Sequence, residues 1–330
     1  MTPGTGPCCP QQEQRTTTNN SAVAPTAVTE AEYNDLVRQG ERTVDNLKRI
    51  FAVAFTLSFG LMGLAVIAKL KTILTSQNAQ LPSFSTWAVN IEMVVMFVVT
   101  AGVFYHQSAK FLDIRYAKKP LSIARPFGFA FDYMILVLTV APFYLMASAF
   151  HPDFTHQVGY LWFYFSYIFL LCQGLFLLVV AHWRHAPHFI DQTIPVEEVS
   201  REKILRTYWF LMNSFIVFVL LASFYVANRF LSLPCPPAPR VGEPPLFLFW
   251  FGAVALTRDY LDYRWAWRFL YPLPAAEAVT LDKWPIKGMI QSGRTRPWAI
   301  IAGAFCVASI LIIYLLKFWD VQQWVTYCSV

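Results

Sequence analysis

Seven apolar stretches divide the 330-residue chain, and the basic residues between them gather on alternate sides. The stretches are residues 50–68, 86–105, 127–149, 158–181, 207–227, 245–257 and 298–316. Of the 26 Lys and Arg residues, 21 lie in the four segments that would share a side with the N-terminus, which are 1–49, 110–125, 184–206 and 258–296. Basic loops of helical membrane proteins stay in the cytoplasm. The sequence therefore predicts an all-α, polytopic membrane protein with seven transmembrane helices, a cytoplasmic N-terminus and an extracytoplasmic C-terminus.

Composition agrees with this class, because 56% of the residues are hydrophobic and only 14% are charged. A transmembrane helix needs about 20 mostly apolar residues. The stretch at 245–257 is shorter, so it spans fully only if its helix continues through the charged residues 258–271. The net charge of +6 fits loops that face anionic lipid, and we expect no nucleic-acid partner.

The regions outside the spans divide into four parts. Residues 1–29 are polar and predict a disordered cytoplasmic tail. Thr29 and Glu32 have the spacing of a capping box, and an amphipathic cytoplasmic helix is expected over 30–49. Residues 184–206 form a cytoplasmic loop, and 320–330 the extracytoplasmic C-terminus.

A short motif occurs twice, 149 residues apart. Residues 111–117 and 260–266 both read aromatic, Leu, Asp, any residue, Arg, aromatic, Ala. A second shared element, Arg-Pro-aromatic, follows at 125–127 and 296–298. The pattern predicts two parallel three-helix repeats, at 50–149 and 207–319, joined by a linker helix at 158–183.

Two resemblances follow from these features. The 3+1+3 layout resembles the SWEET transporters in topology only. Residues 50–57, 104–106 and 141–143 resemble the first three helices of lysosomal-type potassium channels that lack a P-loop, over about residues 45–150. That resemblance implies that Val53 narrows a pore.

Ionisable groups within a bilayer are functional candidates, and the apolar stretches contain two carboxylates, Glu92 and Asp132. Gln173 in the fourth stretch is a further polar candidate. Neither carboxylate is expected at the membrane midplane, which disfavours a proton-coupled carrier. The alternative for Asp132 is a structural salt bridge to Arg125.

The repeated Asp and Arg residues allow two interpretations. Lys110 with Asp113, and Arg258 with Asp262, have the spacing of ion pairs on an exposed helix. Alternatively, the repeat brings four charges together as a gate at one cytoplasmic mouth: Asp113, Arg115, Asp262 and Arg264.

Cysteine and histidine residues provide weaker candidates. Cys235 and Cys328 both fall in outer segments, where a disulfide can join them. Zinc-binding residue types occur at His182, His185 and His188, but Pro187 breaks the helix that would align them, so we predict no metal site.

No catalytic motif occurs in the sequence, since Gly-rich phosphate loops, HExxH and GxSxG are all absent. We therefore expect neither an enzyme nor a cofactor. The predicted function is a channel or facilitator for a small ion or solute, with cations among the candidates. A homo-oligomer around the path fits this function. The alternative is a membrane assembly or docking protein with no pore.

Overall fold

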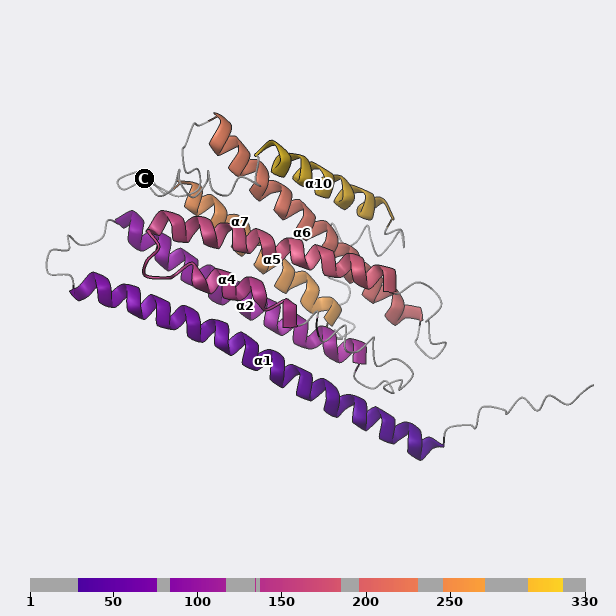
Figure 1. Cartoon of the computed structure of the whole chain (residues 1–330). Coiled ribbons are helices and arrows are strands. Elements are labelled where there is room, and N and C mark those ends of the chain that lie inside the picture. The colour runs from indigo at the N-terminus through magenta and orange to yellow at the C-terminus, as the bar shows by residue number, and fades with distance from the viewer. Residues whose placement is uncertain are drawn as a thin grey trace, which may run out of the picture.

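The computed structural model describes residues 29–75, 84–116, 134, 137–184, 196–230, 246–270 and 296–316. These residues form seven α-helices and contain no strand (Figure 1). The helices are α1 (Glu30–Thr75), α2 (Phe84–Tyr116), α4 (Ala141–Ser148), α5 (His156–Arg184), α6 (Val196–Phe230), α7 (Leu246–Leu270) and α10 (Arg296–Leu315). The expectation of an all-α chain is confirmed over the described ranges.

Five of these helices are long and apolar enough to cross a membrane, namely α1, α2, α5, α6 and α10. The helix α7 is not among them because of the charged residues in its second half, and α4 covers only 8 residues. The chain is therefore compatible with integral membrane localisation.

The first helix begins at the capping box that the sequence predicts. The Thr29 amide donates to Glu32 Oε2 at 3.0 Å, and the Glu32 amide donates to Thr29 Oγ1 at 3.3 Å. From there α1 continues without a break for 46 residues. Its buried face, which includes Val44, Phe51 and Phe55, packs on the bundle.

Contacts between side chains fix the relative directions of the N-terminal helices. Phe51 of α1 stacks on Tyr105 of α2, and Phe59 packs on Phe97, so these two helices are antiparallel. The segment that contains α4 is antiparallel to α5. There Gln173 donates to the Leu138 carbonyl at 2.6 Å, and Trp162 donates to the Leu145 carbonyl at 2.9 Å.

The C-terminal helices follow the same alternation. Tyr208 of α6 donates to the Leu261 carbonyl at 3.2 Å, and Trp250 of α7 donates to Ser223 at 3.0 Å, so α6 and α7 are antiparallel. Trp298 at the start of α10 packs on Tyr208, while Phe305 packs further along α6, so α10 is parallel to α6.

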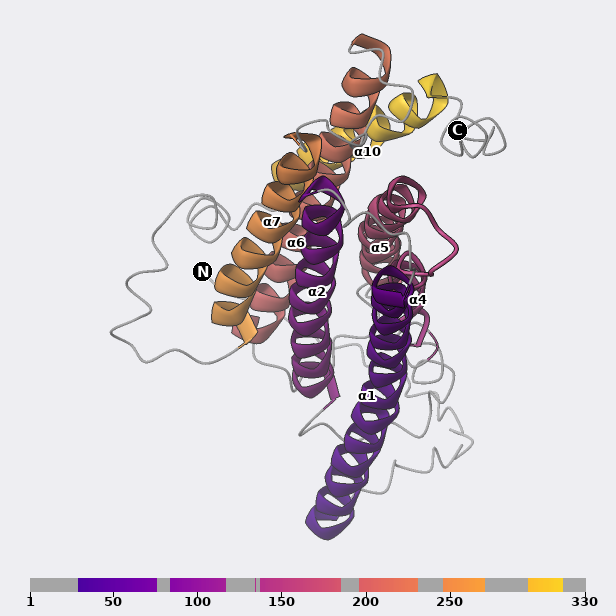
Figure 2. The ribbon, with the colours of Figure 1, turned by 90° about the vertical axis from the view of Figure 1, so that its left-hand side faces the viewer.

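The helices α2 and α7 lie side by side and run in the same direction (Figure 2). Glu92 of α2 lies against Gly252 of α7, and Thr100 bonds Asp259 about two turns further along both helices. The two contacts keep one register, with sequence offsets of 160 and 159 residues. This parallel pair forms the centre around which the site is built.

The core between α2, α5, α6 and α7 is aromatic. Phe251 of α7 is fully buried among three tyrosines of α5, with ring centroids 5.8 Å from Tyr160, 4.6 Å from Tyr164 and 5.6 Å from Tyr167. By contrast, α1 and α10 expose large apolar side chains on their outer faces, including Leu64 and Ile310. An apolar exterior of this kind suits contact with lipid.

Candidate functional site

Three charged side chains of α7 are buried at the centre of the bundle. Arg258 is 2% exposed, and Asp259 and Asp262 are both 0% exposed. Arg258 is the middle residue of α7, just as Thr100 is of α2 and Asn213 is of α6. The group of charges therefore lies half-way along the helices that surround it, and we call these three α7 residues the ionic cluster.

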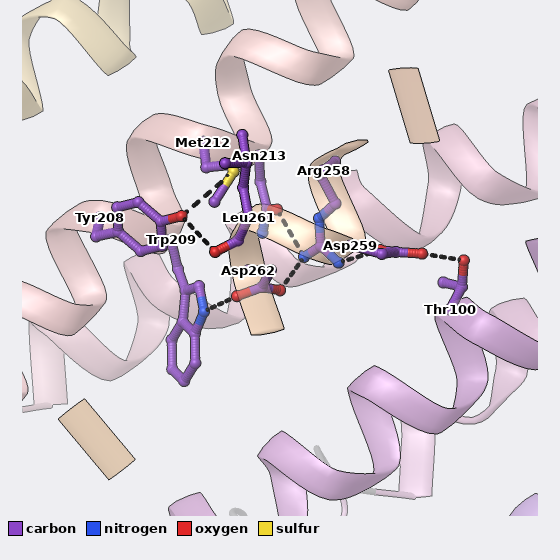
Figure 3. A network of polar contacts seen from close by, with 9 residues as sticks. All are labelled: Thr100, Tyr208, Trp209, Met212, Asn213, Arg258, Asp259, Leu261 and Asp262. Atoms are coloured by element: carbon purple, nitrogen blue, oxygen red, sulfur yellow. Dashed lines mark hydrogen bonds and ion pairs between the residues drawn. The ribbon is translucent and has the colours of Figure 1, made fainter. Parts of the chain in front are cut away.

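The guanidinium of Arg258 is held on three sides (Figure 3). Its Nη1 lies 2.8 Å from Asp259 Oδ1, and its Nη2 lies 2.8 Å from Asp262 Oδ2. Nη2 also donates to Asn213 Oδ1 at 3.1 Å. The Phe104 ring lies 4.7 Å from Cζ, close enough for a cation–π contact.

Each carboxylate of the ionic cluster also accepts a hydrogen bond from another helix. Thr100 of α2 donates to Asp259 Oδ2 at 2.5 Å, and Trp209 of α6 donates to Asp262 Oδ1 at 2.7 Å. The spacing of four residues places Arg258 and Asp262 on one helix face. Because Asp259 is displaced by about 100° around α7, it reaches α2 instead.

The ionic cluster carries an excess of negative charge. Two carboxylates face one guanidinium, and an unbalanced charge is costly in a medium of low dielectric constant. The Tyr167 hydroxyl is fully buried and interacts electrostatically with all three charges, yet within the described part of the chain it has no hydrogen-bond partner. The arrangement can therefore take up a positive charge, as a proton or a small cation.

Of the four charges expected at a cytoplasmic mouth, Asp262 belongs to the ionic cluster and Arg264 does not. Arg264 is exposed and donates to the Tyr260 hydroxyl at 2.6 Å. The pair of Arg258 with Asp262 forms as its spacing predicts, but it is buried and not on an exposed helix base. It is buried because α2 and α6 cover that face of α7.

Asp113 and Arg115 lie near the end of α2, where the structure describes the backbone but not their side chains. Asp113 is about 20 Å along α2 beyond Thr100, whereas Asp262 is about 5 Å along α7 beyond Asp259. Since Thr100 and Asp259 are level, the two copies of the motif differ in height. Their convergence at one mouth stays a prediction.

The remaining predicted residues are dispersed. Glu92 lies against Gly252, Gln173 bonds a backbone carbonyl of the neighbouring helical segment, and Val53 is 60% exposed on the outer face of α1. The side chain of His182 is not described, and five other predicted residues lie outside the described ranges, namely Asp132, His185, His188, Cys235 and Cys328. Over the described ranges, no group of three metal-binding side chains occurs.

Two residues of the ionic cluster, Arg258 and Asp262, were predicted from their spacing as an ion pair, although on an exposed helix. No role was predicted for Asp259, Thr100 or Asn213. Two signals were available. Thr100 and Asn213 each interrupt a long apolar run, and the Arg-Asp pair directly follows an apolar stretch too short to span on its own.

Comparison of the chain with models of protein families gives no match, and neither a curated protein nor a solved structure matches it. The geometry of the ionic cluster is therefore the feature from which a function can be inferred.

Proposed function

We propose that this chain is an integral membrane protein that passes a small ion across the bilayer, as a channel or facilitator. The ionic cluster is the central ion-binding site on the route of that ion. The observation that carries this proposal is the excess negative charge of Asp259 and Asp262 over Arg258, fully buried half-way along the helices. A protein that only needed a stable core would gain nothing from such a charge, since apolar residues of similar size replace buried ion pairs without loss.

Seven crossings follow if α7 and the segment that contains α4 also span. The alternating directions of successive helices support this, because each helix then crosses the membrane in the direction opposite to the helix before it. At 25 residues α7 is about 37 Å long, enough for an apolar core of about 30 Å. Its three central charges do not oppose insertion, because Arg258, Asp259 and Asp262 are paired inside the bundle.

The orientation, with the N-terminus inside, is supported by the distribution of basic residues. It is tested with reporters placed before Glu30 and after Leu316, which should be cytoplasmic and extracytoplasmic, respectively. Reporters on the same side would remove one crossing from the proposal.

The duplicated three-helix unit remains part of the proposal. It is supported by the repeated sequence motif and by the parallel packing of α2 on α7, which are the second helices of the two units. Transporters built from repeats commonly bind their ions where the units meet. The ionic cluster occupies such a position between α2 and α7. A gate formed by Asp113, Arg115, Asp262 and Arg264 would begin at the ionic cluster, through Asp262, and extend toward the C-terminal ends of α2 and α7.

A pore narrowed by Val53 would need more than one copy of the chain, because this side chain faces away from the rest of the bundle. We therefore keep the homo-oligomer as a second arrangement of the same function, with α1 around a shared axis. Cross-linking of Val53→Cys between copies tests it, and no cross-link would leave α1 facing lipid.

The test of the proposed function is a flux assay in liposomes that contain the purified protein. Potassium, sodium, chloride and proton fluxes are measured for the wild type and for Asp262→Asn, with Asp45→Asn on the exposed surface of α1 as the matched control. We expect one ion to cross, and the Asp262 variant alone to lose that flux while still eluting as a folded protein. Absence of flux for every ion would overturn the proposal and favour a docking protein with no pore.

A further inference from the structure

A second polar site lies between α2, α5 and α7, about 12 Å along α2 from Thr100, at Glu92. The Glu92 side chain crosses α7 directly over Gly252, where an added Cβ would come within 2.8 Å of its Cδ. Its Oε1 is buried and accepts no hydrogen bond in the described structure, although the Gly252 amide is close. A buried carboxylate oxygen without a well-placed donor is costly while the group is charged.

Tyr160 of α5 lies near the level of Glu92, because its ring packs on Phe251 while Glu92 lies against the next residue, Gly252. The Tyr160 hydroxyl is fully buried, interacts electrostatically with Glu92, and has no hydrogen-bond partner among the residues the structure describes. A donor and an acceptor that are both unsatisfied and lie close together can exchange a proton directly or through one water molecule.

Few other ionisable groups face Glu92 from the neighbouring helices. The part of α7 before Arg258 carries none, α4 carries only Tyr144, and α5 offers Tyr160. On α1 the contact of Phe59 with Phe97 fixes the register, which places Lys69 about 8 Å beyond the level of Glu92.

Three tyrosines connect this site with the ionic cluster along one face of α5. Tyr160, Tyr164 and Tyr167 are spaced four and three residues apart, which aligns them on a helix. The Tyr164 hydroxyl donates to the Leu220 carbonyl at 2.7 Å, and the Tyr167 hydroxyl interacts with the ionic cluster. Successive rings are separated by about 5 to 6 Å along the axis.

The packing around these tyrosines favours one kind of ion. All three rings are fully buried against Phe251, so a hydrated metal cation could pass only if the rings moved apart. A proton needs only a succession of oxygen atoms. The side chains from Glu92 through the three tyrosines to Asp259 supply such oxygens, as carboxylates and hydroxyls.

We propose that the ion that crosses is the proton, and that Glu92 and Tyr160 form the second proton-binding site on its route. This inference rests on the proposed function, which it makes specific. The Glu92 carboxyl gives its proton to the Tyr160 oxygen while Tyr160 gives its hydroxyl proton to the Tyr164 oxygen. Tyr164 then turns its hydroxyl from the Leu220 carbonyl and gives its own proton to the Tyr167 oxygen, and Tyr167 gives its own to the ionic cluster, so each tyrosine stays neutral. A water molecule carries the proton wherever two of these oxygens are not in hydrogen-bond contact. The proton that arrives at the ionic cluster joins Asp259 or Asp262 and removes one negative charge.

The first experiment measures proton uptake into liposomes under a potassium diffusion potential, with a pH-sensitive dye inside. Glu92→Gln and Tyr160→Phe should each lower proton flux by roughly a hundredfold, the low end of what a positioned proton-transfer group contributes. Tyr105→Phe, which removes a hydroxyl from the aromatic contacts of α1 with α2, should leave it unchanged. Unchanged proton flux in Glu92→Gln would overturn the inference.

The second experiment does not depend on flux. A hydrophobic carbodiimide adds to a protonated carboxyl in an apolar site and rearranges to a stable N-acylurea, which mass spectrometry locates. We expect labelling at Glu92, declining as pH rises, and none at Glu41 on the exposed part of α1. Absence of labelling at Glu92 at every pH would count against a proton-binding site there.

The outcomes separate this inference from the proposed function. Potassium or chloride flux that needs Asp262, with no proton flux, would overturn the inference and leave the function in place. Absence of flux for every ion would overturn both. Proton flux that needs Asp262, Glu92 and Tyr160 would support both.

Discussion

Thr100 and Asp259, 159 residues apart in the chain, are joined by a hydrogen bond of 2.5 Å between α2 and α7. Both residues are fully buried, and the bond fixes the register of the two parallel helices at the height of the ionic cluster. The hydroxyl also directs Asp259 Oδ1 toward Arg258, because Oδ2 is already occupied. One small polar side chain thus holds a buried carboxylate in place from the opposite helix.

We expect Thr100→Val to destabilise the protein by about 1 to 3 kcal/mol, because the valine keeps the shape but leaves Asp259 Oδ2 buried without its donor. Thr100→Ser retains the hydroxyl and should recover most of the loss. Thermal unfolding in detergent, followed by circular dichroism, measures both. Equal stability of the valine variant and the wild type would show that the bond contributes nothing.

Removal of the guanidinium should have a larger effect. Arg258→Met leaves two buried carboxylates without a cation, and we expect a loss of about 3 to 5 kcal/mol. The matched control is Arg264→Met, two turns further on the same helix, where the side chain is exposed and the change should stay within about 0.5 kcal/mol. If both variants unfold at the same temperature, Arg258 does not compensate the carboxylates.

Helix positions and class could be predicted from this sequence because apolar length and capping are local properties. The capping box of Thr29 and Glu32 forms as its spacing predicts, and α1 extends from it. The pairing of Arg258 with Asp262 was also predictable, because side chains four residues apart on one helix lie next to each other whatever surrounds the helix.

The burial of that pair could not be predicted, because it depends on which helices cover α7. Charged residues after a short apolar stretch usually mark its exit into water. Here α2 and α6 supply Thr100, Trp209 and Asn213, each more than 40 residues away from the charges they bind. Contacts between distant segments set their environment, and a local pattern contains no record of them.

The first turn of α1 should depend on pH through Glu32. Hydrogen bonds from the Thr29 amide, and then from its hydroxyl, hold the pKa of the Glu32 carboxyl below its ordinary value. A lowered pKa means that the stabilisation is complete above the ordinary pKa and is lost as pH falls through the lowered one. The protection of the Thr29 amide from hydrogen exchange, relative to its intrinsic rate at each pH, should therefore fall in acid, and Glu32→Gln should remove this pH dependence of the protection. An exchange rate that follows only the intrinsic pH dependence would contradict it.

The contact of Glu92 with Gly252 predicts opposite effects for one substitution at two sites. In an open helix position, Gly→Ala stabilises by up to about 1 kcal/mol through helix propensity. Gly303 of α10 is such a position, with no atom within 4 Å of an added Cβ. At Gly252 the same methyl group would overlap Glu92 and force the carboxylate away from α7. We therefore expect Gly303→Ala to raise the unfolding temperature and Gly252→Ala to lower it.

The double variant Gly252→Ala with Glu92→Ala should recover the lost stability, because the shortened side chain at position 92 no longer overlaps the added methyl group. Double-mutant thermal unfolding measures this coupling, which should reach about 0.5 to 3 kcal/mol for residues in contact. Strictly additive effects would show that Glu92 does not lie on Gly252.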